Sequence, residues 1–278
     1  MPEPHRPFRW DLVRPDRLGT LLEDTPPPDL WYLDDLVECA GLVLARSGDS
    51  DLRFVGRSAD SVFDLLSGAL EHTSWRDRLH QVPLSVFGSY RITDAELPQL
   101  RANLTALGVS PHALATGRPT AFVDLVHEGS TYTNLHRVLR DWIEDERVAW
   151  DVVRRRLRFI GITRRRKTSP KTWRWHQHAE WTADLPASAI RNVSLDWGVW
   201  GWFGDRQPKL TRSFPSTRWA DESVARPRHD ERTRAALAEA LAVVEAGRQR
   251  RKQLVAVLCE EPAIREPWLR GLVNELRA

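Results

Sequence analysis

The sequence lacks any apolar run that approaches the roughly 20 residues a membrane-spanning helix needs. Its first residues, MPEPHRPFRWDLVRPDR, carry charges and prolines but no apolar core, so a signal peptide is not expected. The sequence therefore predicts a soluble protein with no membrane partner.

Cysteine is scarce as well, and the two cysteines, Cys39 and Cys259, stand far apart in the chain. Two distant cysteines provide neither a disulfide framework nor the spacing of a zinc site. We therefore expect two plain buried thiols and a cytoplasmic location.

The signatures of several common active sites are also missing. The chain has no Walker loop, no G-x-G-x-x-G element and no nucleophile elbow of a Ser-His-Asp hydrolase. The net charge of +3 is small, so overall charge does not mark a nucleic-acid-binding protein. The charge is unevenly spread, however, because a basic run begins at Arg154 and ends at Lys171.

What the sequence does contain is an alternation of short apolar runs with helical stretches. Strands are expected over residues 52–57, 83–89, 120–126 and 157–163, with 192–195 as a fifth, and helices over 30–46, 61–71, 95–107 and most of 131–156. Apolar strands separated by helices are typical of a parallel sheet that is covered on both faces. The predicted fold is α/β, a mostly parallel sheet flanked by helices, with a Trp-rich segment and a C-terminal helical extension.

Three regions are expected along the chain. Residues 1–28 form an arm that ends in three prolines, residues 29–228 an α/β domain that includes the Trp-rich segment, and residues 229–278 the C-terminal helices. A capped helix is expected over residues 230–258, which Pro262 stops, and a last short helix over residues 264–277.

Two strand ends carry loops that suit anions, and parallel α/β sheets bind ligands beyond the carboxyl ends of their strands. In the first loop Arg57 offers a forked cation, and Asp60 or Ser61 can start the next helix. The same residues also fit a purely structural turn, in which the next helix is capped and the arginine lies on the surface.

The second loop follows a strand that ends in Asp124. Gly129 permits close approach of a ligand to the backbone, and Ser130 and Thr131 open a helix whose N-terminus carries partial positive charge. The pattern predicts a phosphate site in which Asp124 accepts from sugar hydroxyls or holds a hydrated Mg²⁺. His127, beside the loop, can act as an acid or base at neutral pH. A purely structural role fits the same residues: Asp124 would cap a turn, and Ser130 or Thr131 would cap the helix.

The order of these loops resembles the type I phosphoribosyltransferases. The signature of that family is an apolar strand, two acidic residues, a short spacer and then Thr-Gly-x-Thr, and residues 123–131 (VDLVHEGST) lie on it without a gap. The resemblance implies a protein that binds phosphoribosyl pyrophosphate or a nucleotide with Mg²⁺. If catalytic, such a protein transfers a phosphoribosyl group and releases pyrophosphate.

The resemblance also implies a role for each site residue. Asp124, with His127 beside it, would face the ribose hydroxyls, and the rings of Trp197 and Trp200 would stack on a base. The phosphate-binding residues would be Arg57, Ser58, Asp60 and Ser61 around the pyrophosphate, and Gly129, Ser130 and Thr131 around the 5′-phosphate.

Two positions depart from the family pattern. Val123 stands where the first acidic residue is expected, and Glu128 replaces the threonine before Gly129. A glutamate that pointed into the phosphate cradle would repel the ligand by on the order of a few kcal/mol. Three alternatives therefore stay open: an unusual substrate, an outward-turned Glu128, or a fold kept without the standard reaction.

Residues 154–181 support a second hypothesis, because their basic side chains are interleaved with tryptophans. Such a pattern binds single-stranded nucleic acid through phosphate neutralisation and base stacking. A solvated charged loop over a Trp-rich core would have the same composition. The alternative function is a non-catalytic protein that binds a nucleotide or single-stranded nucleic acid. His176 and His178 have metal-ligand spacing, but the sequence offers no third ligand nearby.

Overall fold

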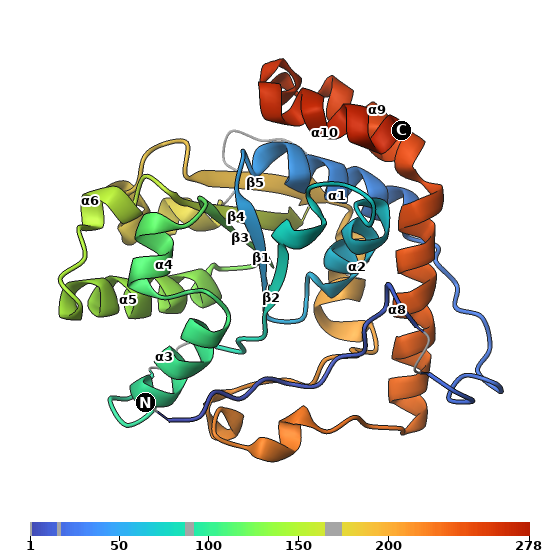
Figure 1. Ribbon diagram of the computed structural model, residues 1–278, viewed down its shortest axis with the longest axis horizontal. Helices are drawn as coiled ribbons and strands as arrows, with labels where there is room; N and C mark the ends of the chain where they lie inside the picture. Colours follow the sequence, from blue (N-terminus) through green and yellow to red (C-terminus); the bar gives the residue numbers. More distant parts are fainter. Residues whose placement is uncertain (1, 16–17, 87–91, 165–173) are drawn as a thin grey trace.

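The computed structural model describes residues 2–15, 18–86, 92–164 and 174–278. Its centre is a five-stranded sheet in the order β2-β1-β3-β4-β5, in which every neighbouring pair is parallel (Figure 1). The strands are β1 (Asp51–Val55), β2 (Leu79–Val82), β3 (Thr120–Leu125), β4 (Leu157–Arg164) and β5 (Ile190–Leu195). The predicted α/β class with a parallel sheet is confirmed.

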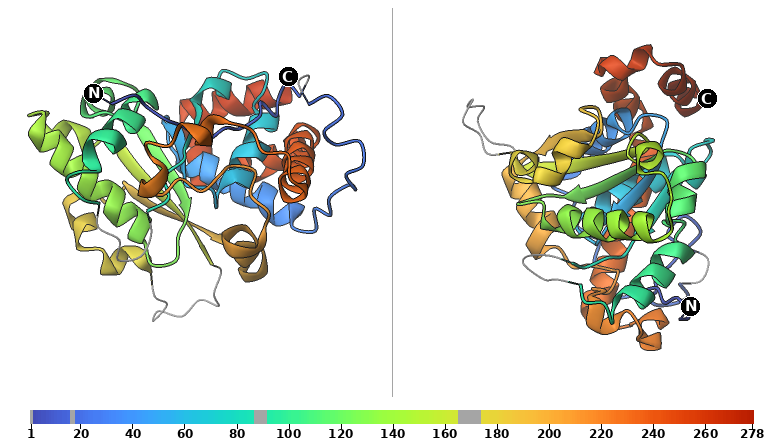
Figure 2. Two further views of the ribbon diagram at one scale, coloured as in Figure 1. Left: turned by 90° about the horizontal axis from the view of Figure 1, so that it is seen from below. Right: turned by 90° about the vertical axis from the view of Figure 1, so that its left-hand side faces the viewer.

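Helices cover both faces of this sheet (Figure 2). On one face, α1 (Leu33–Arg46) and α2 (Asp60–Ala69) share a buried core with Phe54 and Val123. On the other face, Phe122 and Phe159 pack with α3 (Leu97–Ala106), α4 (Pro111–Thr116), α5 (Ser130–Asp145) and α6 (Trp150–Val153). Strand side chains thus enter two cores alternately, which explains why the central strands are apolar throughout.

The C-terminal helices are α8 (Glu231–Gln249), α9 (Arg251–Glu260) and α10 (Pro267–Arg277), and their buried side chains join the core of α1 and α2. The backbones of α2 and α8 approach closely, because a Cβ placed on Gly68 would lie 1.9 Å from the carbonyl oxygen of Val244. Asp230 caps α8, since its carboxylate accepts from the backbone N–H of Thr233 at 2.9 Å. The single helix expected over residues 230–258 is wrong, because the chain is interrupted at Arg250 between α8 and α9.

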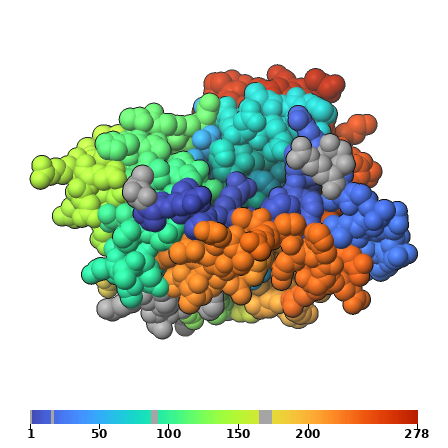
Figure 3. All heavy atoms as spheres, turned by 60° about the horizontal axis from the view of Figure 1, so that its bottom comes forward, coloured from blue at the N-terminus to red at the C-terminus, as the bar shows by residue number. Residues whose placement is uncertain are grey.

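The N-terminal arm lies against the segment that leads into α8, as the space-filling view shows (Figure 3). The backbone N–H of Phe8 donates to the carbonyl of Val224 at 2.8 Å, and that of His5 donates to the side chain of Asn103 on α3 at 2.8 Å. The arm is therefore fixed at two points on the body of the protein.

Several predicted elements are misplaced. β2 ends at Val82, whereas a strand is expected over residues 83–89; Pro83 has no N–H to donate to a sheet ladder, and residues 87–91 lie outside the described part of the chain. The helix expected over most of 131–156 is interrupted, because Arg147 has a φ of +54° between α5 and α6. Helix α4 is not predicted from the sequence.

Cys39 and Cys259 are both thiols rather than halves of a disulfide, and Cys39 is buried in α1. Cys259 is exposed on α9, so the expectation of two buried thiols is wrong for this residue. Within the described residues, no helix has both the length and the apolar character that a bilayer crossing requires.

Candidate functional site

A cavity of about 780 Å³ lies at the carboxyl ends of β1 and β3. The chain leaves β1 toward one edge of the sheet and leaves β3 toward the other, which makes this the switch point where open α/β sheets bind ligands. Gly56, Arg57 and Ser58 of the first loop line the cavity together with residues 124–131 of the second. The two loops that the sequence singles out therefore meet in one place.

The backbone turn at Gly129 requires glycine for two reasons. Its φ of +81° is left-handed, and a Cβ there would lie 2.6 Å from the ring of Trp175. Ser130 then begins the 16-residue helix α5, whose first backbone N–H groups have no acceptor within the helix. Because Gly129, Ser130 and Thr131 all line the cavity, the turn can offer these donors and the positive end of α5 to an anion.

Trp175 supports this turn from the protein interior. The side chain is 1% exposed, its ring lies 5.3 Å from that of Tyr132, and its Nε1 donates to Asn192 Oδ1 at 2.8 Å. The hydroxyl of Tyr132 in turn donates to the carbonyl of Ile160 on β4 at 2.8 Å. The turn is thus held by aromatic packing that is anchored to the sheet.

Two tryptophans of the Trp-rich segment that follow the basic run pack against the body of the protein. Trp175 is buried, and Trp181 stacks on His136 with ring centroids 4.4 Å apart. These two rings fit the core interpretation of the segment rather than a hairpin that presents them to nucleic acid. Four members of the basic run, Arg165, Arg166, Lys167 and Lys171, lie outside the described residues, as does Trp173.

Asp124 lies in the cavity wall and is 6% exposed. Burial raises the pKa of its carboxyl well above the usual range, against the opposing effects of a backbone hydrogen bond from Leu125 and the charge of Lys209. A buried carboxyl of this kind can accept from, or donate to, sugar hydroxyls.

His127 and Glu128 lie at the cavity wall but turn toward solvent. Their side chains are 65% and 72% exposed, and His127 Nδ1 lies 4.0 Å from Glu128 Oε1. Of the alternatives for Glu128, this is the outward-turned one, and the glutamate does not fill the hollow. His127 also lies near Trp200, another residue of the wall, and their ring centroids are 6.1 Å apart.

The first loop contributes only its first half to the cavity. Gly56, with a φ of +73°, makes the turn, and Arg57 Nη1 donates to the carbonyl of Thr211 at 3.2 Å. Asp60 and Ser61 do not line the cavity; Asp60 pairs with Arg9 at 3.1 Å, and Ser61 Oγ accepts from Gln207 Nε2 at 2.8 Å. The helix start that the sequence assigns to pyrophosphate is occupied by contacts within the protein.

Most of the positive charge of the cavity comes from a region to which the sequence assigns no role. The lining cations are Arg57, Lys209, Arg212, Arg218, Arg228 and Arg232. Among the residues that the structure describes, none of these six has a carboxylate oxygen within 4.0 Å. Burial lowers the pKa of Arg57; Asp60 opposes this effect, and Arg228, Arg232 and Arg218 add to it. Like charges that outnumber the carboxylates around them favour a polyanionic ligand.

Of the two tryptophans expected to stack on a base, one lies at the cavity and the other does not. Trp200 lines the cavity, and its Nε1 donates to the carbonyl of Ile162 at 3.0 Å. Trp197 does not line the cavity and is 67% exposed. Only Trp200 is therefore in position to contact a ligand bound there.

The residues fit a magnesium ion that arrives with phosphates rather than one held by the protein alone. The described residues contain no group of three or more His, Cys, Asp or Glu side chains that could hold a metal, so His176 and His178 gain no third ligand there. Magnesium in proteins is commonly bound by one or two carboxylates together with phosphate oxygens and water. Asp124 is the buried carboxylate in a position to take that part.

No protein-family model matches this chain, and neither a curated protein nor a solved structure matches it. The functional interpretation rests on the geometry and charge of the cavity.

Proposed function

We propose that the cavity binds a ribose phosphate that carries a second anionic group, such as phosphoribosyl pyrophosphate or a nucleotide. One observation carries the proposal: the glycine turn at the start of α5 and Arg57 line the same cavity. In this arrangement the 5′-phosphate accepts from the turn at Gly129–Thr131, and the ribose lies against Asp124.

The charge of the cavity supports a ligand with more than one phosphate. Its six cations face three lining carboxylates, Asp124, Glu128 and Asp205, and Glu128 and Asp205 are exposed. Arginines bind phosphate oxygens through paired, charge-assisted hydrogen bonds, so the group around Arg57, Arg228 and Arg232 suits a pyrophosphate.

Transfer of the phosphoribosyl group is the reaction that such a site supports. The bond between the ribose C1 and the pyrophosphate oxygen breaks as the bond from C1 to an acceptor forms, and the pyrophosphate departs with the bonding electrons. The arginines would stabilise the charge that develops on the leaving group. Bound magnesium would supply further neutralisation of the phosphate oxygens.

Asp124→Asn tests the ribose end of the site. Because burial already favours the neutral carboxyl, asparagine should leave the free energy of unfolding near the wild-type value. We expect the affinity for phosphoribosyl pyrophosphate with Mg²⁺ to fall about 5- to 100-fold, since a buried hydrogen-bonding group left without its partner costs about 1–3 kcal/mol. Inorganic pyrophosphate should bind as before, and calorimetric titration measures both.

The matched control is Asp205→Asn, which removes an exposed carboxylate of the same cavity and should weaken neither ligand. Equal losses for the two ligands in Asp124→Asn, or no loss for either, would contradict the placement of the ribose at Asp124.

Lys209 makes anion binding depend on pH. Burial lowers the pKa of its ammonium from 10.5 to about 8, while Asp60 raises it and Arg57 lowers it further. The ammonium is charged below that pKa and becomes neutral as the pH rises through it. Sulfate keeps its charge throughout, so we expect its affinity to fall roughly tenfold between pH 7 and pH 9. Lys209→Arg should remove the fall, and a wild-type affinity that is flat over this range would show that Lys209 does not face the anion.

A further inference from the structure

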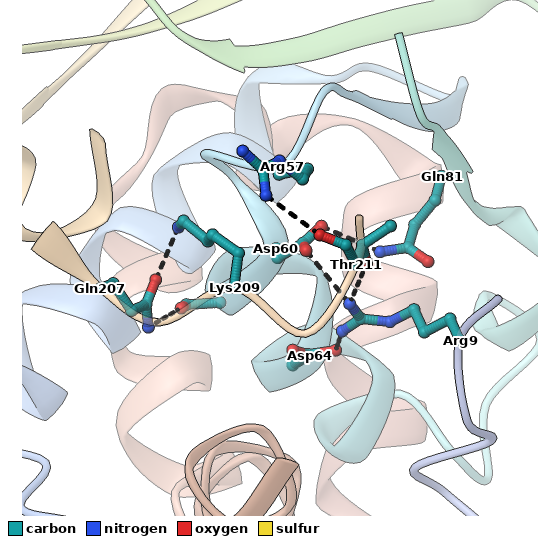
Figure 4. Close-up of polar contacts among 9 residues, drawn as sticks. Arg9, Arg57, Asp60, Asp64, Gln81, Gln207, Lys209 and Thr211 are labelled. Carbon is teal, nitrogen blue, oxygen red and sulfur yellow. Dashed lines mark hydrogen bonds and ion pairs between the residues drawn. The ribbon is translucent and has the colours of Figure 1, made fainter. Parts of the chain in front are cut away.

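Arg9 of the N-terminal arm lies buried next to the cavity, between two carboxylates of α2 (Figure 4). Its Nη1 lies 3.1 Å from Asp60 Oδ2 and its Nη2 lies 2.5 Å from Asp64 Oδ1, and the three side chains are 6%, 9% and 4% exposed. Burial alone would lower the pKa of Arg9, but the two carboxylates offset burial and raise it. Arg9 is therefore a permanent cation in a buried ion-pair cluster.

Lys209 stands between this cluster and the cavity. It lines the cavity, and its Nζ donates to Gln207 Oε1 at 2.7 Å. Gln207 Nε2 donates at 2.8 Å both to Ser61 Oγ and to Glu239 Oε1 on α8. The charged groups that act on Lys209 are Asp60 and Asp64 of α2, Glu239 of α8, Asp124 of β3 and Arg57 of the first loop. Buried carboxylates thus compete with a cavity anion for the same ammonium.

Thr211 links Arg9 to the cavity wall directly. Its Oγ1 accepts from Arg9 Nη1 at 2.7 Å, and its carbonyl accepts from Arg57 Nη1 at 3.2 Å (Figure 4). The flanking residues Lys209 and Arg212 both line the cavity. The arm therefore holds the short segment from which two of the cavity cations project.

We propose that Arg9 is a positioning residue of the anion cavity, which neutralises Asp60 and Asp64 so that Lys209 and Arg57 stay available to the ligand. The inference rests on the proposed function for its ligand, but its electrostatic step involves only residues of this chain. Burial already raises the pKa of Asp64 to about 6, against the effect of Arg9, so Asp64 would tend to be neutral without Arg9. Asp60 would then be the carboxylate without a partner, and it would compete with a cavity anion for Lys209 and Arg57. The N-terminal arm is then part of the site, although Arg9 does not line the cavity.

The electrostatic step can be tested without any ligand. The lysines of the chain are Lys167, Lys171, Lys209 and Lys252, so pulse labelling of amines with acetic anhydride can be resolved peptide by peptide. In the wild type the labelling midpoint of Lys209 should lie near pH 8. Arg9→Met should raise this midpoint by about one pH unit, because Asp60, the carboxylate with the largest effect on Lys209, loses its partner. The exposed Lys252 on α9 is the internal control and should not shift.

Three further variants keep the test decisive if Arg9→Met alone does not fold. Arg9→Met with Asp64→Asn removes one charge of each sign and leaves Asp60 without Arg9, so the midpoint of Lys209 should still lie above that of the wild type. Adding Asp60→Asn should bring the midpoint down to the wild-type value or below it, because Asp60 and Asp64 both raise the pKa of Lys209 in the wild type. Asp60→Asn alone, with Arg9 present, is the reference for that step.

The link to ligand is tested by titrating inorganic pyrophosphate into the same full-length variants. Arg9→Met, or the double variant in its place, should bind about tenfold more weakly than the wild type, and the triple variant should recover most of the loss. Arg14→Met, at an exposed position of the same arm, should change neither readout.

The possible outcomes distinguish a failure of the role assigned to Arg9 from a failure of the proposed function. A fall in melting temperature with an unmoved Lys209 midpoint would make Arg9 merely structural and would overturn the inference. A shifted midpoint with unchanged pyrophosphate affinity would overturn it too. If the midpoint shifts as expected but the wild type binds no phosphate compound, the coupling of Arg9 to Lys209 stands and the proposed function fails.

Discussion

Gly68→Ala is expected to lower the free energy of unfolding by about 3 kcal/mol or more, at the upper end of overpacking effects. The added Cβ would lie 1.9 Å from the carbonyl oxygen of Val244 and 2.8 Å from its carbon, so α2 and α8 would have to move apart. The same contact is close from the other side, since a Cβ on Gly247 would lie 2.1 Å from the carbonyl oxygen of Leu65. Because the obstacle is backbone, a change of rotamer cannot relieve it.

Thermal unfolding measures this effect, and a loss of that size corresponds to about 6–12 °C in a domain of this class. Gly271→Ala is the matched control, because Gly271 lies in α10 with no atom within 4 Å of an added Cβ. There alanine should stabilise the helix by about 0.5–1 kcal/mol. Similar melting temperatures for the two variants would show that α2 and α8 do not approach as closely as described.

Replacing two rim arginines should have the largest effect on ligand binding. Arg228→Gln with Arg232→Gln removes two of the six cavity cations, and both are exposed and free of ion pairs within the described residues. Each hydrogen bond from a charged group to phosphate contributes about 1.5 kcal/mol or more, so the double variant should bind pyrophosphate roughly 100-fold more weakly. Stability should change little, since neither side chain packs in a core.

A control with the same change in net charge separates a local site from general attraction. Arg226→Gln with Arg234→Gln alters two arginines of the same region that do not line the cavity. Direct contacts predict a small effect for this pair, whereas a diffuse electrostatic effect predicts equal losses for both pairs. Calorimetric titration at two salt concentrations distinguishes these results.

The sequence predicts the central strands well because β1, β3 and β4 are buried on both faces and therefore carry continuous apolar runs. It misplaces β2 because this edge strand includes His80 and Gln81, while the more apolar residues after Pro83 lie beyond it. Edge strands bury less surface, so their hydrophobic pattern is weaker.

The residues of the candidate site also differ in whether the sequence predicts them. Arg57, Asp124 and the turn at Gly129–Thr131 are local features at strand ends, so their spacing is visible in the sequence. Lys209 and Arg228 reach the cavity through an irregular segment without periodicity, and only the tertiary fold brings them there. Asp60 and Asp64 do leave a trace, because two acids at i and i+4 in a mostly apolar helix require a buried cation. The sequence does not reveal that Arg9 supplies it.

The most direct test of the account is a calorimetric titration of the wild-type protein with phosphoribosyl pyrophosphate in the presence of Mg²⁺. The account predicts one binding site, for which ribose 5-phosphate and inorganic pyrophosphate each compete more weakly, and no response to Mg²⁺ alone. If none of the three phosphate compounds binds, or if pyrophosphate fails to compete with phosphoribosyl pyrophosphate, the cavity does not hold the two anionic groups assigned to it.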